Sequence, residues 1–426
     1  MSMTLTEKIL ARASGNDIVK PGQFINAKVN SIGTMDTLGK ILLDAFGKLN
    51  LDKIPDPEKF IICFDHQIPA NEVKFANVQK AIRDLAQRYG VKYLYDTGRG
   101  GILHQVLHEK GHVIPGTVTV ATESHTPTSG AVGAVVLGVG QTEGAMALAT
   151  GDIWLRVPET IKVELKGRLR KGVSAKDISL LLMKLLGFEK KAVYRAVEFA
   201  GDGIASLSMD SRLTLTNMIA DSGAKNGIFP VDDVTVEYLK HRTDKPFERL
   251  QPDPDAVYVE TLTIDLSTLE PQIMCPPDMD NIKPLSKLEK IFVNQAVIGS
   301  CTNGRLEDLA IAAEILKDRK IAPSVRLLVN PASQEVLQKA LKAGYIDTLV
   351  EAGAMVGPPS CGPCHGGHTG LLADNEVVIS STNRNFEGRM GSKKSLVYLA
   401  SPAVVAASAV SGYIDAPAPW SRMEDA

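Results

Sequence analysis

The chain has 426 residues, which predicts two or three domains, because single hydrophobic cores stop growing at shorter lengths. Hydrophobic residues make up 44% of the chain and charged residues 23%, with a net charge of −2, as is typical of a globular protein. The 47 basic residues are matched by 49 acidic ones and form no long run, which argues against nucleic-acid binding and favours small-molecule chemistry.

The N-terminal segment MSMTLTEKILARASG predicts a short amphipathic helix of mixed charge. It lacks the apolar run and the cleavage site of a signal peptide, so we expect a cytoplasmic protein. The most apolar segment, residues 131–151, is interrupted by glycines and by Gln141, Thr142 and Glu143, which a bilayer core would penalise. We expect this segment to form a buried, glycine-rich helix or helix pair.

Strand-like and helix-like segments alternate along the whole chain, which indicates α/β layering. In the first part we expect strands at residues 59–64, 91–96 and 118–122, and a helix at residues 70–90 that ends at Gly90. Polar loops follow these strands, with the sequences DHQIPAN, TGRGGILHQ and ESHTPTSG. Because α/β sheets bind their ligands at the carboxyl ends of strands, these loops are candidate site segments.

The pattern changes near Pro158, where residues 158–179 predict an edge strand followed by a capped helix. The proline-rich strings QPDPD and CPPD indicate a linker or long surface loop before the pattern restarts near Lys290. Beyond it we expect strands and helices in alternation, at residues 291–300, 305–319, 324–330 and 333–344. The prediction is therefore three α/β lobes, at residues 1–158, 159–284 and 285–426.

Cys361 and Cys364 lie in the string GPPSCGPCHGGHTG, which fits a thioredoxin-like dithiol, a c-type haem attachment or a metal site. Haem attachment normally follows export, which the expected cytoplasmic location disfavours. A redox dithiol needs a strand-to-helix turn, and the glycines and prolines on both sides disfavour a helix start. A metal-ligand loop remains.

Cys301 follows the predicted strand 291–300, in the string CTNGR. Together with Cys361 and Cys364 it gives three thiolates from two loops of one lobe. Since there is no second CxxC motif, these thiolates suit a metal centre with one open position. Cys63 and Cys275 are interpreted as core or surface thiols.

Five segments resemble the motifs of the aconitase superfamily, in the family's order along nearly the whole chain. They are FDHQIPA, ESHTPTSGAVGA, GSCTNGR, GPPSCGPCHGG and STNRNFEGRMGS. Within that superfamily the chain is most similar to large subunits of 3-isopropylmalate dehydratase, with those of homoaconitase and 2,3-dimethylmalate dehydratase close behind. The resemblance implies an aconitase-like fold of three α/β lobes around a 4Fe-4S cluster, held by Cys301, Cys361 and Cys364 with the fourth iron open to substrate. Such an iron would act as a Lewis acid and stabilise the negative charge that develops when hydroxide leaves a hydroxy acid.

The resemblance also implies roles for polar side chains. An Asp beside a His can hold the ring protonated for delivery to the leaving hydroxyl, although a helix cap and a loop histidine are the alternative reading. The residues expected to be catalytic are Asp65, His66, His104, Glu123, His125 and Asp221. The residues expected to bind substrate are Ser124, Asn217, Asn383, Arg384 and Arg389, since guanidinium groups bind carboxylates at two points.

Three departures from the family's pattern bear on the substrate. Glu123 stands where the family usually has Asp, and Asp221 stands where it usually has Glu. These exchanges keep the charge but change its reach by one methylene. Met35 stands before Asp36 where a polar residue is usual, so we expect a more apolar substrate arm.

The family's serine base, in a Gly-Ser-Ser-Arg-Glu type motif, has no counterpart in this sequence. We therefore expect a separate small subunit that carries the swivelling domain with the serine base. The expected activity is that of an iron-sulfur hydro-lyase of leucine biosynthesis, acting on isopropylmalate without nucleic-acid or membrane partners. Two alternatives come from other classes, an RNA-binding regulator and a zinc or redox scaffold that uses only the CxxC motif.

Overall fold

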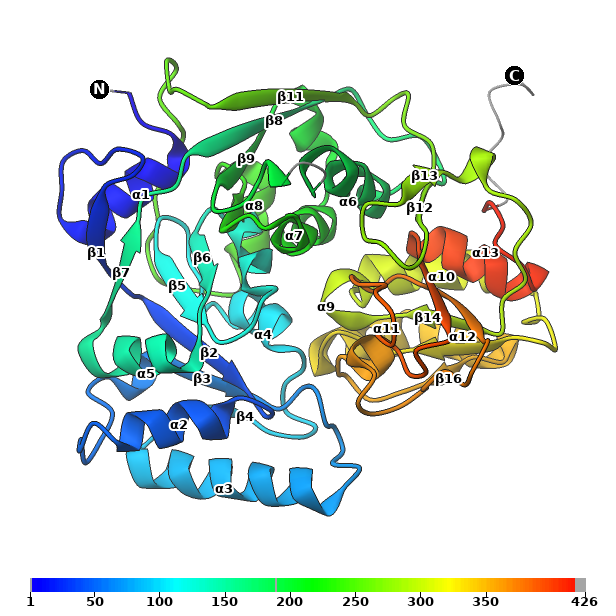
Figure 1. Cartoon of the computed structure of the whole chain (residues 1–426), viewed down its shortest axis with the longest axis horizontal. Coiled ribbons are helices and arrows are strands. Elements are labelled where there is room, and N and C mark those ends of the chain that lie inside the picture. Colours follow the sequence, from blue (N-terminus) through cyan, green and yellow to red (C-terminus); the bar gives the residue numbers. More distant parts are fainter. Residues whose placement is uncertain (1, 188–189, 418–426) are drawn as a thin grey trace. The chain divides into compact units, whose positions relative to one another are not determined.

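The computed structural model describes residues 2–187 and 190–417. The chain forms two compact units, the first made of Met1–Lys166 and Lys190–Ile264 and the second of Gly167–Glu189 and Asp265–Ala426 (Figure 1). Both units are layered α/β structures, as predicted. The segment 167–189 thus belongs with the C-terminal half of the chain. The division into three lobes stays a prediction.

The first unit contains three sheets with helices around them. Its helices are α1 (Leu5–Ser14), α2 (Gly39–Gly47), α3 (Val73–Tyr89), α4 (Leu103–Glu109), α5 (Gln141–Thr150), α7 (Met209–Met218) and α8 (Asp233–Leu239). Its strands are β1 (Phe24–Lys28), β2 (Ser31–Met35), β3 (Phe60–Cys63), β4 (Tyr93–Tyr95), β5 (Val118–Ala121), β6 (Val135–Gly138), β7 (Asp152–Arg156), β8 (Thr160–Lys166), β9 (Ala196–Ala200), β10 (Asn226–Ile228) and β11 (Glu260–Asp265).

The largest sheet of this unit has the strand order β4-β3-β2-β5-β6, with every neighbouring pair parallel. Strand β3 is buried along its whole length, as expected for a parallel strand covered on both faces. Met35 pairs with Cys63, and Ala121 pairs with Gly138, at the carboxyl ends of four strands. The loops that follow these strands therefore all leave the sheet on the side of its carboxyl ends, and the predicted site segments lie in these loops.

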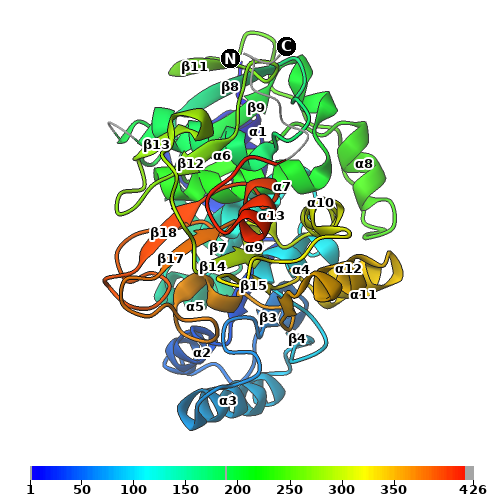
Figure 2. The same cartoon turned by 90° about the vertical axis from the view of Figure 1, so that its right-hand side faces the viewer.

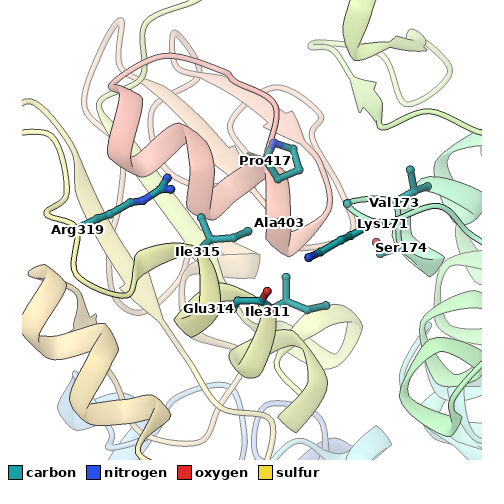
Figure 3. A pocket seen from close by; sticks show the side chains of 10 residues that line it. Lys171, Val173, Ser174, Ile311, Glu314, Ile315, Arg319, Ala403 and Pro417 are labelled. Atoms are coloured by element: carbon teal, nitrogen blue, oxygen red, sulfur yellow. The ribbon is translucent and has the colours of Figure 1, made fainter. Parts of the chain in front are cut away.

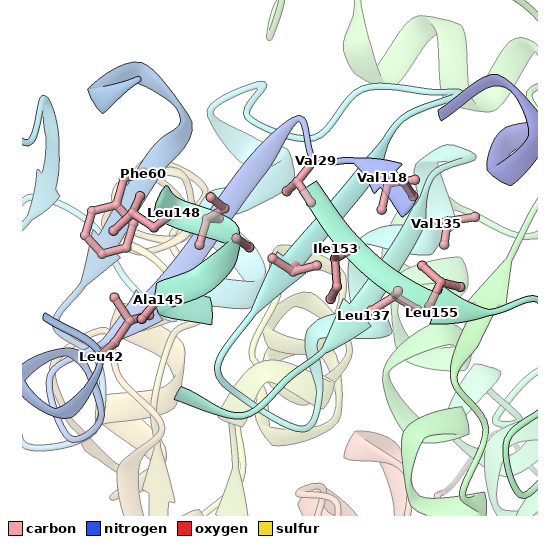
Figure 4. Close-up of a cluster of buried hydrophobic side chains, with 14 of the residues drawn as sticks. Val29, Leu42, Phe60, Val118, Val135, Leu137, Ala145, Leu148, Ile153 and Leu155 are labelled. Carbon is pink, nitrogen blue, oxygen red and sulfur yellow. The ribbon is translucent and has the colours of Figure 1, made fainter. Parts of the chain in front are cut away.

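The core of this sheet is a cluster of aliphatic and aromatic side chains (Figure 4). Leu42 of α2, Phe60 of β3, and Ala145 and Leu148 of α5 all belong to this cluster. All four side chains are at most 3% exposed. Complete burial of a leucine or phenylalanine side chain contributes roughly 1.5–3 kcal/mol, so this packing holds the sheet rigid beneath the polar loops at its carboxyl end.

The prediction of a helix or helix pair at residues 131–151 is confirmed for the second half of the segment and wrong for the first half. The segment contains the end of the 3₁₀ turn Thr126–Val132, then strand β6, then helix α5. Gly133, at φ +84°, ends the turn, and the apolar run Val135–Gly138 pairs with β5. A short, fully buried strand and a buried helix have the same hydropathy, so the pattern of the sequence did not separate them.

The prediction of an edge strand at residues 158–179 is also wrong in its placement. The strand is β8, but it lies inside a four-stranded sheet with the order β10-β9-β8-β11. Its alternating burial reflects one exposed face of that sheet and not an open edge. The capped helix that was predicted after it is confirmed as α6 (Ala175–Leu182), with Ser174 as its N-cap.

The second unit is built on a seven-stranded sheet with the order β13-β12-β18-β17-β14-β15-β16. Strands β18, β17, β14 and β15 lie side by side in that order (Figure 2). The strands are β12 (Gln272–Met274), β13 (Ile282–Pro284), β14 (Gln295–Ile298), β15 (Arg326–Val329), β16 (Met355–Val356), β17 (Val377–Ser380) and β18 (Leu396–Leu399). Besides α6, the helices are α9 (Ser300–Asn303), α10 (Leu306–Leu316), α11 (Gln334–Lys342), α12 (Tyr345–Ala352) and α13 (Pro402–Ser411).

Most of the predicted elements are confirmed, with ends shorter by a few residues. They include α1, α3, β3, β4, β5, β14, α10, β15 and α11. Gly90 adopts φ +71° and ends α3 as predicted. Helix α12 was not predicted. Among the described residues, no helix has both the length and the hydropathy needed to cross a membrane.

The buried Glu198 of β9 fixes the N-terminal helix α1. Its carboxylate accepts hydrogen bonds from the backbone amides of Leu5, at 3.1 Å, and Thr6, at 2.8 Å. The Tyr258 hydroxyl donates a third bond at 3.2 Å. Burial raises the pKa of this carboxyl, although the three donors oppose that rise. The amides at the start of α1 thus obtain their acceptors from a strand nearly two hundred residues away.

We expect Glu198→Leu to destabilise the first unit by about 2 kcal/mol, because it leaves buried amides without acceptors. For a unit of this size that loss lowers the midpoint of thermal unfolding by roughly 4–8 °C. Calorimetry of the full chain measures the shift, with Glu248→Leu at an exposed position as the matched control. Equal midpoints for the two variants would contradict the role assigned to Glu198.

Candidate active site

The first unit gathers four predicted site residues into one buried group at the carboxyl edge of its parallel sheet. Glu123 and His125 follow β5, His104 lies in α4, and Asp221 lies in the 3₁₀ turn Ile219–Ser222 after α7. The side chains of His104, His125 and Asp221 are each at most 3% exposed. A loop, a helix and a turn from distant parts of the chain therefore supply a single cluster of acids and histidines.

Glu123 is the centre of this group. Its Oε2 is in close contact with Nε2 of His104 and accepts a 2.6 Å hydrogen bond from the backbone amide of His125. The Ser124 hydroxyl donates to the other carboxylate oxygen at 3.1 Å. On the far side of the group, Nε2 of His125 lies 3.0 Å from Oδ2 of Asp221. Nδ1 of His125 lies 3.6 Å from Oε1 of Glu123, so two carboxylates and two imidazoles alternate along one row of close charge contacts.

The alternation sets the protonation of the group. Burial alone would lower the pKa of His125, but the charge and hydrogen bond of Asp221, with help from Glu123, raise it to about 9. Burial alone would raise the pKa of Glu123, but His104 and His125 hold that pKa well below its usual range. At neutral pH the group therefore carries an imidazolium at His125 and a carboxylate at Glu123.

A second pair lies at the end of β3. Nδ1 of His66 is 2.6 Å from Oδ1 of Asp65, and the other oxygen of Asp65 accepts the backbone amide of Leu103 at 2.8 Å. The carboxylate is thus fixed on both oxygens and orients the imidazole ring. A histidine that acts as an acid needs a carboxylate that orients its ring, and Asp65 is placed to do this. The role of His66 as an acid stays a prediction.

Asp36, which follows β2, was missed as a site residue. Its carboxylate accepts hydrogen bonds from the backbone amides of His66, at 3.1 Å, and Gln67, at 2.8 Å, and so holds the turn that carries His66. Burial and the neighbouring charge of Asp65 raise the pKa of Asp36. The position of Asp36 at the end of a strand could have marked it as a site residue in the sequence. Its contact with residues thirty positions away, however, depends on the parallel pairing of β2 with β3.

Asn217 is completely buried in α7, where its amide donates to the Thr128 hydroxyl at 2.8 Å. The contact joins α7 to the 3₁₀ turn after His125. This position supports the geometry of the histidine group, and binding of substrate by Asn217 stays a prediction.

The second unit brings the three predicted metal ligands to strand ends. Cys301 lies in α9 directly after β14, and Cys361 and Cys364 lie in the loop after β16. All three are buried, at 4–7% exposure. The five cysteines of the chain all lie in its described part, and none forms a disulfide. Gly362–His365 is a single 3₁₀ turn and not the start of an α-helix, as the argument against a redox dithiol expected.

Asn383, after β17, connects the two cysteine loops. Its amide nitrogen lies 3.5 Å from the Cys301 sulfur, and its amide oxygen accepts from the Cys364 thiol at 3.3 Å. Arg389, from the same segment, donates to the Cys364 sulfur at 3.6 Å. Hydrogen bonds to sulfur tune the metals that thiolates bind, so these residues are placed to act on a metal centre.

The loop that carries Asn383, Arg384 and Arg389 is itself fixed by a buried lysine. Lys176, at the start of α6, donates from Nζ to the carbonyl of Ser381 at 3.0 Å and to the carbonyl of Thr382. Its side chain is fully buried. Together with the hydrogen bond from the Gln272 amide to Asp177, at 2.9 Å, this contact joins α6 to the second unit.

The donors of this region fit an iron-sulfur cluster. Three buried thiols from two loops are the ligand type that such clusters use. Within the described residues, Nε of Arg389 and both amide atoms of Asn385 are buried without a hydrogen-bond partner. Buried polar atoms are seldom left in that condition, so they indicate that another group completes this region.

A separate cavity of the second unit, of about 450 Å³, contains none of the predicted site residues. Ile311 and Ile315 of α10, Ala403 of α13 and Ser174 before α6 lie around it (Figure 3). Among the described residues its lining includes no cysteine and no histidine, so it does not offer the thiolates of a cluster site.

We expect His125 to titrate near pH 9 and Asp221→Asn to bring its pKa down sharply, because burial alone lowers it. Since the folded pKa lies above the ordinary value of about 6.5, the stability from this pair is present below that pH and is lost as the pH rises through about 9. NMR of histidine-labelled chain measures the titration, with Asp84→Asn at an exposed position as control. Titration of His125 below pH 7 in the unaltered chain would contradict the assigned charge.

The sequence profile of the aconitase family (aconitate hydratase) matches residues 48–291 and 278–412. The "Probable 3-isopropylmalate dehydratase large subunit" of Methanothermobacter thermautotrophicus is 47% identical over 98% of this chain and 99% of its own length. The 3-isopropylmalate dehydratase large subunit of Moorella thermoacetica is also 47% identical, over 98% of this chain and 99% of its own. Large subunit 1 of that enzyme from Methanopyrus kandleri is 45% identical, over 99% of this chain and 100% of its own.

The crystal structure of aconitase X from Thermococcus kodakaraensis aligns with a TM-score of 0.49 and 14% identity, over 90% of this chain and 93% of that one. The sequence relatives carry the assignment, because they match at high identity from end to end. An iron-sulfur cluster is the cofactor that their family implies. The chain belongs to the aconitase family.

Proposed function

We propose that this chain is the large subunit of a hydro-lyase that interconverts 3-isopropylmalate and 2-isopropylmalate through an enoic intermediate. The observation that carries the proposal is the meeting of Cys301, Cys364 and Asn383 at the strand ends of one sheet, in a chain with full-length relatives of that name. Homocitrate and 2,3-dimethylmalate are the alternative substrates, since their enzymes share the same motifs.

Cys301, Cys361 and Cys364 would hold a 4Fe-4S cluster through three of its irons. When bound, the cluster supplies a Lewis-acidic iron that lowers the cost of expelling hydroxide from a carbon next to a carboxylate. Asn383 and Arg389 would tune the sulfur ligands by the hydrogen bonds described above. A cytoplasmic location is part of the proposal, because thiol ligands persist in a reducing compartment.

The other residues would handle the substrate and its protons. The Arg384 and Arg389 guanidinium groups would bind substrate carboxylates. His66, oriented by Asp65, would give its proton to the departing hydroxyl. The imidazolium of His125, held by Asp221 and Glu123, would stabilise the negative charge that develops on the substrate.

The base that removes the proton from carbon would come from a separate small subunit. The sequence holds no counterpart of the family's serine motif, and the relatives are named large subunits. We propose that this small subunit carries the serine on a swivelling domain. The isolated chain would then bind the cluster but turn substrate over poorly.

We expect the chain, reconstituted anaerobically with iron and sulfide and mixed with its small subunit, to hydrate and dehydrate isopropylmalate. Cys301→Ser should lose both iron and activity, because one of three cluster ligands is gone. Cys275→Ser is the matched control, since Cys275 is also buried but lies in the turn after β12. Iron and sulfide analysis and the absorbance of the enoic acid measure the two outcomes.

Three results would contradict the proposal. They are full cluster content in Cys301→Ser, a chain that holds zinc after anaerobic purification, and a full cluster with no turnover of any hydroxy dicarboxylic acid in the assembled enzyme. Turnover of homocitrate in preference to isopropylmalate would move the assignment to the alternative substrate.

A further inference from the structure

A cavity of about 180 Å³ lies in the first unit, among α1, β6, β7 and the start of β10. Six of its lining side chains are leucine, isoleucine or valine. Four of these, Val135, Leu137, Ile153 and Leu155, belong to the buried cluster drawn in Figure 4. None of the predicted site residues is among its described lining residues. A cavity of about 150 Å³ with aliphatic walls binds benzene, so this one has room for a guest of about six to eight non-hydrogen atoms.

The buried side chain of Asn226, which lines this cavity, has a hydrogen-bond donor without an acceptor. The residue is 1% exposed, and its amide oxygen accepts a 3.1 Å hydrogen bond from the backbone amide of Val136. That bond fixes which way the side-chain amide is turned, because the Val136 amide needs an oxygen as its partner. The amide nitrogen of Asn226 has no hydrogen-bond partner among the described residues. Buried donors are seldom left in that condition, so we expect a guest in the cavity to bring an acceptor atom.

Two cations of the lining gather around one aromatic ring. Cζ of Arg156 lies 4.7 Å from the centre of the Tyr194 ring, and Nζ of Lys225 lies 5.1 Å from it. Within the part of the chain that the structure describes, neither cation forms an ion pair with a carboxylate. The one carboxylate of the lining, that of Glu143, accepts the backbone amide of Gly140 at 2.9 Å. The lining thus carries one more positive than negative charge, which favours an anionic guest.

We propose that this cavity binds the anion of a short aliphatic carboxylic acid with about six carbon atoms. The carboxylate accepts a hydrogen bond from the Asn226 amide and pairs with Arg156 and Lys225, while the alkyl chain lies among the leucine, isoleucine and valine side chains. Such an acid supplies both the acceptor that the amide lacks and the charge that the two cations lack. Water would supply the acceptor but not the charge. The site is separate from the proposed reaction and does not depend on it.

Isothermal titration calorimetry of the full chain with 4-methylpentanoate measures this binding. Acetate keeps the charge without the alkyl chain, and 4-methylpentanamide keeps the skeleton without the charge. Asn226→Asp retains the oxygen that Val136 needs and puts an anionic oxygen in place of the amide nitrogen, with Asn16→Asp at an exposed position as its control. Arg156→Gln removes one cation at an exposed position. Its control is Arg88→Gln, because the Arg88 guanidinium is also exposed and also lies over a tyrosine ring, at 5.3 Å.

We expect 4-methylpentanoate to bind about 10-fold or more tightly than either acetate or 4-methylpentanamide, because each of these lacks one of the two kinds of contact. Asn226→Asp should abolish binding of the acid, since it places a like charge against the carboxylate. Arg156→Gln should weaken binding about fivefold, as is typical for one exposed charge pair. Both control variants should bind the acid as the unaltered chain does.

Equal affinity for the acid and its amide would overturn the inference, and so would a full chain that binds neither and holds only water in the cavity. Undiminished binding of the acid in both Asn226→Asp and Arg156→Gln would place the acid elsewhere and overturn it as well. If Asn226→Asp does not fold, Arg156→Gln decides alone, because that side chain is exposed. No turnover is measured, so the outcome is independent of the success or failure of the proposed function.

Discussion

Both cysteine loops of the second unit pack against one buried residue, Asn330, and the arrangement of the thiols depends on that packing. Asn330 follows β15, which lies between β14 and β16 in the sheet. Its backbone amide donates to the carbonyl of Ile298 at the end of β14, and its side-chain amide donates to the carbonyl of Pro358 after β16. The residue after β15 thus fixes the loops that follow the two neighbouring strands, with Cys301 after β14 and Cys361 after β16.

The glycines of these loops are required by the same contact. A Cβ at Gly362, which has φ +56°, would lie 2.4 Å from the Asn330 amide oxygen, and one at Gly357 would lie 2.5 Å from its amide nitrogen. On the other loop, a Cβ at Gly304 would lie 2.8 Å from the Asn330 carbonyl oxygen. The glycines bring the backbone of both loops against a single residue, one loop against its side chain and the other against its carbonyl. Cys301 and Cys361, sixty positions apart in the sequence, thereby lie on loops that pack against the same residue.

The first unit holds charged side chains in a buried group, and each charge is stabilised by a neighbour of opposite sign. Alternation of carboxylates and imidazoles lets Glu123 and His125 remain ionised although both are enclosed. Removing one partner of a buried pair typically costs about 3–5 kcal/mol, because the other charge is left uncompensated. The group is therefore stable only as a whole.

The sequence predicted local features well and pairings between distant segments poorly. Helix α3 and strand β3 follow from periodicity and apolar runs, and the position of Cys301 follows from the strand before it. The internal position of β8 could not be foreseen, because its partner β11 begins nearly a hundred residues later. Asp36 and Asn330 were missed for the same reason, since each acts through strands that only the sheet order makes neighbours.

The central claim is that Cys301, Cys361 and Cys364 hold one four-iron cluster in which a single iron lacks a protein thiolate. Mössbauer spectroscopy of the chain reconstituted with ⁵⁷Fe tests this most directly. Three thiolates on four irons predict two classes of iron in a ratio of about three to one, with the minor class altered by substrate. Four equivalent irons, or a chain that takes up no iron while its cysteines stay reduced, would contradict the account.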